Sequence, residues 1–388
     1  MTRVRVAGGG LTHFGVHPER TSRALFGEAG EAALEDAGVD REDVESVFFG
    51  NFMGELAEHQ GHMGPLAAEA LGIDAPSTRY ESACASSGVA VRQAVQNVRN
   101  GEADVVLVGG AERMNNLPTA ETTDALAIAA DDLYEVRAGM TFPGAYALME
   151  DAYFEEHGGT REDLAHIAVK NHQNALGNEY AQFQKEIDVE TAMEAPPVAE
   201  PIHLYDACPI TDGAAAMVLV SDSYAEEHDL DAPVAITGTG QGSDRLALQD
   251  REELTRTPAA EDAGAEAFAD AGIDPDDVDL AEVHDCFTIA EALAIEALGF
   301  FEPGEGIAAA RRGETTATGD LPVNLSGGLK AKGHPVGATG ASQVVEMAKL
   351  LAGTHHNSDA VADATVGVTH NAGGTVASTA VHVLEVVE

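Results

Sequence analysis

Side chains that could carry out chemistry occur in four short segments of this 388-residue sequence. The first reads Glu81-Ser-Ala-Cys84-Ala-Ser-Ser-Gly, and we expect its cysteine where a short β segment turns into a helix. Unpaired backbone N–H groups and the positive end of the helix dipole favour a thiolate there, and the small neighbours leave room for a bulky ligand. Cys84 is thus a candidate nucleophile. The alternative is an inert buried cysteine, which is common in protein cores.

A glycine-rich loop makes up the second segment, which reads Ser326-Gly-Gly-Leu-Lys-Ala-Lys-Gly-His334-Pro-Val-Gly-Ala-Thr-Gly. It leads into a predicted helix over residues 341–351. The loop lacks the Gly-Lys-Ser/Thr ending of a nucleotide-binding P-loop. A lone histidine is usually structural, but one fixed between glycine and proline in such a loop favours a functional role for His334.

The third and fourth segments add groups that could move protons or bind an oxyanion. Glu282-Val-His284-Asp-Cys286-Phe lies at the end of a predicted strand, where side chains two residues apart face the same way. An imidazole and a thiol together suit a proton-transfer step, whereas a metal site would need more ligands at other spacings. Near the C-terminus, Thr369-His-Asn-Ala-Gly373-Gly-Thr could supply backbone N–H groups to an oxyanion.

The elements expected to hold these segments alternate between strands and helices. Apolar runs predict strands over 4–7, 44–49 and 105–108, the last ending at Gly109-Gly110. Helical patterns cover 22–37, closed by Gly38, and 85–99. This alternation is typical of an α/β protein whose strands are largely parallel and buried on both faces.

A weak repeat suggests two similar halves. Residues 33–44 resemble residues 267–278, and in each copy a helix ends at glycine, crosses an acidic turn and enters a strand. We predict an N-terminal half over 1–230 and a C-terminal half over 231–388. Between about 113 and 205 the pattern loosens into a mostly helical insertion rich in methionine and aromatic residues, which are usually core residues and here could also line a substrate entrance.

The four segments together resemble the thiolase superfamily over nearly the whole chain. The cysteine turn, Asp212-Gly-Ala-Ala-Ala and the long Gly-His-Pro block occur in the expected order. The His284-Asp-Cys286-Phe motif is similar to that of the sterol-carrier-protein-type branch and of archaeal acetoacetyl-CoA thiolases. The resemblance implies an α/β thiolase-like fold, in which two similar halves form five layers, α-β-α-β-α, with a helical loop insertion in the first half.

The resemblance also implies a role for each candidate. Cys84 would attack an acyl-CoA thioester, while His334 would accept the thiol proton and bind the thioester oxygen. Cys286 would remove the α-proton of the second acyl-CoA, and His284 would act at the enolate oxygen. A second oxyanion site would use the Cys84 N–H and a backbone N–H near Gly373.

Three further features bear on this comparison. Most thiolases carry a C-terminal Cys-x-Gly motif where this sequence has His370-Asn-Ala-Gly373, and in the sterol-carrier-type branch the Cys286 position takes over that acid/base role. Cys208 is assigned to the structure. For coenzyme A we expect contacts from the glycine-rich loop, namely Ser326, Gly327, Lys330 and Lys332; a merely solvent-exposed role for the lysines is the alternative.

The implied function is that of an acetyl-CoA C-acyltransferase, which condenses two acyl-CoA molecules to a short 3-ketoacyl-CoA or cleaves that product. Two alternatives remain: a ketoacyl-synthase-type condensing enzyme, and a non-catalytic thiolase-like acyl-CoA-binding or scaffold subunit. We expect no metal or other cofactor beyond the CoA thioesters, and a homodimer or homotetramer. Resemblance to archaeal relatives also implies a small OB-fold, zinc-ribbon partner protein.

Composition limits where such a protein would work. With 66 acidic against 21 basic residues the net charge is −45, which excludes a basic nucleic-acid surface and disfavours anionic membranes. We interpret the dispersed acidity as the surface of a halophilic protein, because about 1 M salt shortens the Debye length to roughly 3 Å. No signal peptide or membrane span is expected and three cysteines fit a reducing compartment, so the predicted location is cytoplasmic.

Overall fold

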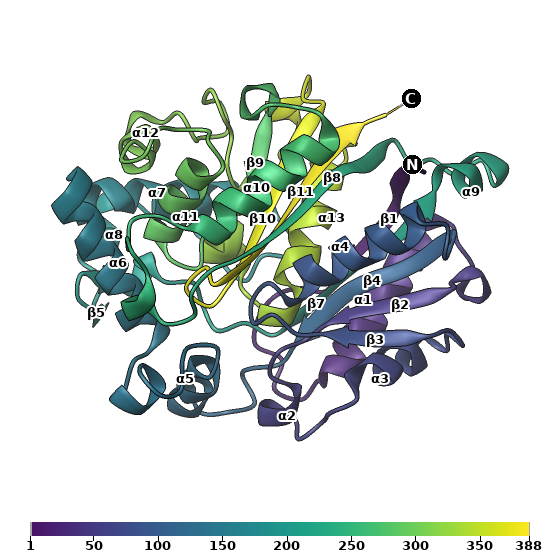
Figure 1. Ribbon diagram of the computed structural model, residues 1–388, viewed down its shortest axis with the longest axis horizontal. Coiled ribbons are helices and arrows are strands. Elements are labelled where there is room, and N and C mark those ends of the chain that lie inside the picture. The colour runs from purple at the N-terminus through teal and green to yellow at the C-terminus, as the bar shows by residue number, and fades with distance from the viewer. Residues whose placement is uncertain (1, 388) are drawn as a thin grey trace.

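The computed structural model describes residues 2–387, so Met1 and Glu388, the outer ends of the two predicted halves, lie outside it. A nine-stranded sheet runs through the molecule (Figure 1). In spatial order its strands are β3 (Ser77–Tyr80), β2 (Ser46–Gly50), β4 (Val105–Glu112), β7 (Gly213–Ser221), β1 (Val4–Leu11), β8 (Val234–Ser243), β11 (Ser378–Val386), β10 (Val366–Gly373) and β9 (Leu280–Glu282). The first five strands form one half-sheet and the last four another, joined where β1 pairs with β8.

The prediction of largely parallel strands is wrong. Among the described strands of this sheet, three pairs are parallel, β2–β3, β2–β4 and β9–β10; five others are antiparallel. The prediction rested on strands buried on both faces, such as β7, which is buried throughout. Layers of helices on both faces bury a strand whatever its direction, so burial did not report orientation.

Helices form three layers around the two half-sheets. On the outer face of the first half-sheet lie α1 (Ser22–Ala37) and α3 (Met63–Leu71), and α10 (Pro258–Ala271) and α11 (Thr288–Ala297) pack outside the second. Between the half-sheets, α4 (Ser86–Arg99) and α13 (Thr339–Leu351) contact each other and strands of both halves. The fold is therefore the predicted five-layered α-β-α-β-α arrangement.

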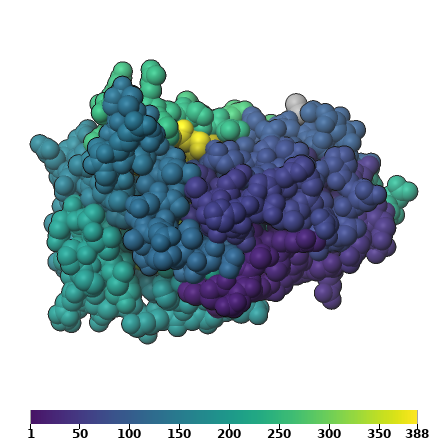
Figure 2. Space-filling view, turned by 90° about the horizontal axis from the view of Figure 1, so that it is seen from below, coloured from purple at the N-terminus to yellow at the C-terminus, as the bar shows by residue number. Residues whose placement is uncertain are grey.

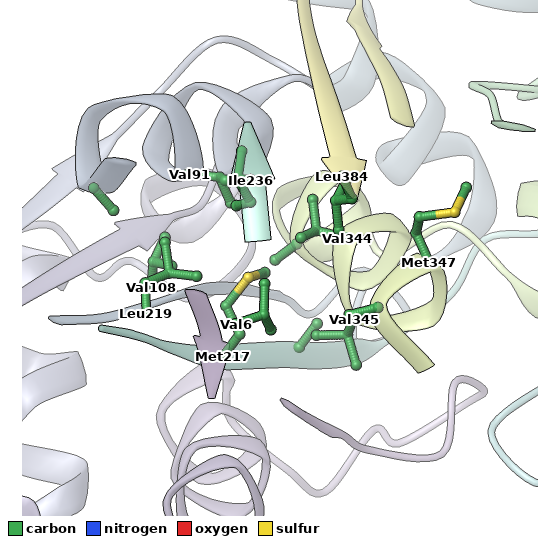
Figure 3. Packing of buried hydrophobic residues seen from close by; sticks show 14 of the residues in the cluster. Val6, Val91, Val108, Met217, Leu219, Ile236, Val344, Val345, Met347 and Leu384 are labelled. Atoms are coloured by element: carbon green, nitrogen blue, oxygen red, sulfur yellow. The ribbon is translucent and has the colours of Figure 1, made fainter. Parts of the chain in front are cut away.

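The central layer is held by an apolar core shared between the halves. Figure 3 shows Val91 of α4 and Val344 of α13 beside Val108, Ile236 and Leu384 of the strands, and all five are 0% exposed. Burial of side chains of this size stabilises a fold by about 1.5–3 kcal/mol each. The packing fixes the two central helices against each other.

The predicted repeat has a structural counterpart in both halves, because α1 and α10 each end at a left-handed glycine, Gly38 or Gly272, and a short 3₁₀ turn then leads to β2 or β9. In the first, β1 passes so close to α1 that a Cβ on Gly10 would lie 2.1 Å from the carbonyl oxygen of Ala29; in the second, a Cβ on Gly240 of β8 would lie 2.0 Å from that of Ala263 in α10. Glycine is needed at both places because any side chain would collide with helix backbone. Helix α1 ends, as predicted, at Gly38, which has a φ of 63°.

The insertion over 113–205 is mostly helical, as predicted. It contains α5 (Thr119–Ala127), α6 (Phe142–His157), α7 (Arg161–Asn174), α8 (Val189–Met193) and a hairpin of β5 (Pro197–Ala199) and β6 (Ile202–His203). The remaining short helices are α2 (Gly54–Ala57), α9 (Asp222–Glu227) and α12 (Gly306–Arg312). In the insertion, α5 packs against α2, and α6 and α7 pack against α11 and α12 outside the second half-sheet (Figure 1). Within the described chain, no helix has both the length and the apolar character needed to cross a bilayer.

Candidate active site

Three of the predicted catalytic residues meet beside the N-termini of α4 and α13. Cys84 lies directly before α4, His334 before α13, and His284 after β9. One donor atom from each residue lies within 4.8 Å of the other two. The two imidazole rings contact edge to face, with centroids 5.0 Å apart and an angle of 87°.

Cys84 is presented by a tight turn. Ala83 has a φ of +49°, a conformation that an alanine adopts only where surrounding contacts hold it, and its N–H donates to the Glu81 carboxylate at 2.7 Å. The expectation of a thiolate at Cys84 is wrong: burial raises the pKa of Cys84 to about 12, outweighing the backbone N–H of Gly374, which lowers it. Cys84 is therefore a thiol that needs a base.

His334 is oriented as that base. The Thr339 hydroxyl donates to the carbonyl of Pro335 at 3.0 Å, and its oxygen lies 2.7 Å from His334 Nδ1. Because a hydroxyl has one hydrogen, the oxygen accepts from Nδ1–H, which leaves the lone pair of Nε2 free. Burial lowers the pKa of His334 to about 3, so the ring is neutral and able to accept a proton at pH 7.

His284 is oriented the opposite way by Asn371. The Asn371 amide donates to the Cys84 carbonyl at 3.0 Å, and the same Nδ2 lies 3.2 Å from His284 Nδ1. His284 Nδ1 therefore accepts, and its proton is on Nε2, a buried atom without a hydrogen-bond partner among the described residues. Burial, with His334 and His370 nearby, lowers the pKa of His284 well below its ordinary range, so this ring is a neutral donor.

The site thus pairs one imidazole that accepts with one that donates. A thiol and two imidazoles also have the atom types found in metal sites, but in this hydrogen-bonding state His284 Nε2 carries a proton and offers no lone pair. The arrangement suits deprotonation of Cys84 by His334 and hydrogen bonding by His284 to a substrate oxygen.

Cys286 lies beyond the end of β9, in the loop before α11, so the prediction that it shares a strand face with His284 is wrong. Its carbonyl accepts from the N–H of Cys208 at 2.9 Å. Burial raises the pKa of Cys286 well above that of a free thiol, and Cys208 and Cys84 nearby add to this shift. All three cysteines of the chain therefore lie in one region.

A cavity of about 740 Å³ leads from the surface to the backbone beside Cys84. Ser82, Ala83, Gly373 and Gly374 are among the residues that line it. A Cβ on Gly373 would lie 2.4 Å from the carbonyl oxygen of Ser82, so glycine is needed there. Figure 2 shows C-terminal atoms (yellow) exposed between blue and green segments, which agrees with a lining drawn from both halves.

The residues expected to contact coenzyme A are buried inside the protein. The Ser326 hydroxyl donates to the Glu282 carboxylate, Gly327 directly precedes a π-helical turn, and Lys330 Nζ donates to the carbonyl of Ala207 at 2.5 Å. Lys332 is 1% exposed, with its Nζ 3.5 Å from the Glu346 carboxylate. Because these ammonium groups do not reach the surface, contact with the CoA phosphates does not fit the structure.

Asn371 and Thr339 were quoted within the sequence motifs but not assigned a role. Asn371 fits between Gly88 of α4 and Gly340 of α13, where a Cβ would lie 2.6 Å and 2.3 Å from its side-chain oxygen. The signal available in the sequence was a glycine near the start of each helix. That signal predicts a site only if one already knows that these two segments, some 250 residues apart in the sequence, lie side by side.

Comparison with known proteins shows the family to which the chain belongs. The thiolase N-terminal domain family matches residues 4–223, and the family described as thiolase C-terminal domain-like matches residues 240–386. The chain belongs to the thiolase family. The predicted thiolase function, an acyltransferase activity, is thereby confirmed over the ketoacyl-synthase-type alternative, and the boundary near residue 230 stays a prediction.

Individual relatives point to one branch of the family. An acetyl-CoA acetyltransferase of Methanothermobacter thermautotrophicus is 43% identical over 99% of both chains. Sterol carrier protein 2 of Bos taurus is 32% identical over 96% of this thiolase and 70% of its own length. Among solved structures, an Ltp2-ChsH2(DUF35) aldolase matches with a TM-score of 0.85 and 28% identity, covering 99% of this chain and 98% of that one.

Proposed function

We propose that this thiolase transfers an acetyl or other short acyl group through Cys84 and makes or cleaves a short 3-ketoacyl-CoA such as acetoacetyl-CoA. The observation that carries the proposal is the convergence of one thiol, one imidazole that accepts and one that donates within 4.8 Å. The acetyl-CoA acetyltransferase name of a relative at 43% identity supports the short acyl group.

In the first half-reaction, Cys84 Sγ attacks the thioester carbonyl and its proton passes to His334 Nε2. The oxyanion accepts hydrogen bonds from the Cys84 N–H and from the Gly373-Gly374 backbone, which lines the cavity. When the tetrahedral intermediate collapses, the C–S bond to CoA breaks and the His334 proton leaves with the CoA thiol. The products are acetyl-Cys84 and free CoA.

In the second half-reaction, Cys286, whose raised pKa keeps most of it as a thiol, reacts through the fraction present as thiolate and takes an α-proton from the second acyl-CoA. The enolate oxygen accepts hydrogen bonds from His284 Nε2–H, and the enolate carbon attacks the acetyl-Cys84 carbonyl. The new carbon–carbon bond forms as the bond to Cys84 Sγ breaks, and the proton that Cys286 took from the substrate carbon passes to the departing Cys84 thiolate, which restores the Cys84 thiol. Thiolysis runs these steps backwards, with Cys286 as the acid.

Rapid-quench peptide mass spectrometry after mixing with acetyl-CoA in molar KCl tests this proposal. We expect an acetyl adduct on Cys84, its loss in Cys84→Ala, and its retention in the matched control Cys208→Ala. A folded wild-type chain without the adduct would contradict independent catalysis and favour the scaffold alternative, unless addition of a partner protein restores it.

We also propose an oligomer, and a small partner protein of the OB-fold, zinc-ribbon kind. β3 lies at the edge of the sheet, which leaves one side open to another chain. The similar solved structure, the Ltp2-ChsH2(DUF35) aldolase, is named for two components, and this supports a partner. Light scattering coupled to size exclusion measures the oligomeric state, and a monomer at working concentration would contradict the proposed oligomer.

Co-purification with the protein encoded beside the gene tests the proposed partner.

The net charge of −45 supports a cytoplasm rich in salt. At low ionic strength the uncompensated carboxylates repel one another, and about 1 M salt screens that repulsion. We therefore expect the melting temperature to rise by at least about 10 °C between roughly 0.1 M and 2 M KCl. A melting temperature independent of KCl would contradict the halophilic assignment.

A further inference from the structure

Tyr146 contacts two parts of the candidate site. It lies on α6, is 1% exposed, and its hydroxyl donates to the carbonyl of Gly374 at 3.1 Å. Its ring stacks on Phe287, the neighbour of Cys286, with centroids 4.5 Å apart. The same side chain thus contacts the loop of Gly373 and Gly374, beside Cys84, and the loop that carries Cys286.

The Tyr146 hydroxyl also interacts electrostatically with the Cys286 thiol, and this interaction lowers the pKa of Cys286 against the larger effect of burial. A phenol has one proton to donate, so it can serve the Gly374 carbonyl or the Cys286 sulfur, but not both at once. A neutral thiol is a weak acceptor and a thiolate a strong one. The preferred acceptor therefore depends on whether Cys286 holds its proton.

The loop of Gly373, Gly374 and Thr375 is held in place by more than the Tyr146 hydrogen bond. Arg251, in the segment that follows β8, donates from its guanidinium to the carbonyl of Thr375 at 2.6 Å and to the Thr375 hydroxyl at 3.0 Å. Its side chain is 2% exposed. Because this second buried anchor holds the same loop, the Tyr146 hydroxyl is free to turn toward Cys286.

We propose that Tyr146 is a positioning residue for Cys286. The Tyr146 hydroxyl donates to the Gly374 carbonyl while Cys286 is a thiol, and it donates to the Cys286 sulfur when Cys286 is a thiolate. This rests on the proposed function. The α-proton moves between substrate carbon and Cys286 Sγ, and Tyr146 keeps its own proton throughout. Burial, with Cys286 and Cys84 nearby, raises the pKa of Tyr146 well above its ordinary value, so the phenol remains a donor at working pH.

Tyr146→Phe removes this donor and keeps the ring that stacks on Phe287. A hydrogen bond to a charged group that is lost in the second half-reaction predicts a roughly 10- to 100-fold lower rate of condensation and thiolysis. The acetylation burst at Cys84 should stay within about threefold of wild type. The pH at half-maximal condensation should shift upward by about one unit, because a thiolate without its donor is harder to form.

Tyr153→Phe is the matched control. Tyr153 lies on the same helix and is 0% exposed, and its hydroxyl donates a hydrogen bond to the Glu296 carboxylate, away from the cysteines. We expect this variant to lose stability but to keep the pH profile of condensation. If Tyr146→Phe does not fold, 3-fluorotyrosine at position 146 keeps ring and hydroxyl while strengthening the donor, and should shift the same midpoint downward.

Two failures are distinguishable. Wild-type protein that forms no acetyl-Cys84 contradicts the proposed function. Wild-type protein that forms it, together with a Tyr146→Phe variant whose condensation profile is unchanged or whose two half-reactions fall equally, overturns the role of Tyr146. An unchanged midpoint with 3-fluorotyrosine overturns it as well.

Discussion

Replacing Thr339 with valine should slow acetylation of Cys84 without changing the shape of the site. The Thr339 oxygen accepts from His334 Nδ1–H at 2.7 Å and its hydrogen goes to the carbonyl of Pro335 at 3.0 Å. Valine has nearly the same volume but no acceptor. His334 is then no longer held in the tautomer whose Nε2 lone pair accepts the Cys84 proton.

The magnitude follows from the burial of this hydrogen bond. Thr339 is 1% exposed and His334 5% exposed, and a buried donor left without its acceptor costs about 1–3 kcal/mol. With a tenfold change in rate for each ~1.4 kcal/mol, acetylation should slow by roughly 5- to 150-fold. Single-turnover release of CoA from acetyl-CoA, followed by a thiol reagent after rapid quench, measures this rate directly.

Two variants make the experiment decisive. Thr339→Ser keeps the hydroxyl and should recover most of the rate. Thr379→Val removes a hydroxyl that is equally buried but has no partner among the described residues, so it should acetylate at the wild-type rate. Acetylation of Thr339→Val within about twofold of wild type would refute the assignment of the His334 tautomer.

Three other predictions concern the groups around Cys84 and His334. Asn371→Ala should lower thiolysis about tenfold, because His284 Nδ1 loses the donor that keeps the proton on Nε2; steady-state kinetics measures it, and an unchanged rate would argue against a donating His284. Glu112 accepts four hydrogen bonds, two on each oxygen, from the segments after β2 and from the loop of His334. Glu112→Gln turns two of these contacts into facing donors, so the free energy of unfolding should fall by about 2–6 kcal/mol in urea titrations, unlike that of the exposed control Glu121→Gln. Since burial lowers the pKa of His334 to about 3, acetylation should persist at about pH 5 and fail only toward pH 3; a loss with a midpoint near the ordinary histidine value of about 6.5 would contradict a buried neutral base.

Sequence alone was sufficient for the class of fold, for the thiolase family and for its acyltransferase function. Helix α1 begins and ends as its pattern predicts, because threonine and glycine act locally as caps: Thr21 accepts from the N–H of Ala24, and Gly38 adopts a left-handed conformation. The Gly-His-Pro and His-Asp-Cys-Phe motifs were recognisable because each is contiguous in the chain. Local conformation and short motifs are properties that neighbouring residues decide.

Strand direction, the protonation state of Cys84 and the accessibility of the lysines needed the tertiary structure. Lys330 and Lys332 looked like phosphate ligands among so few basic residues, but the loop that carries them is covered on every side and they bond to the interior. The start of a helix favours a thiolate at Cys84, yet removal from water outweighs that local field.

One physical reason separates the features that the sequence determines from those that only the tertiary structure decides. Caps, turns and motif spacing depend on hydrogen bonds within a few residues, so the sequence determines them. Solvation and tautomer depend on which distant segments close over a side chain: Asn371 orients His284 and contacts the Cys84 carbonyl across 287 residues. The sequence therefore supplies the candidate residues of the site, and the fold decides which side chains are placed to accept a proton, which to donate one, and which are buried away from the cavity.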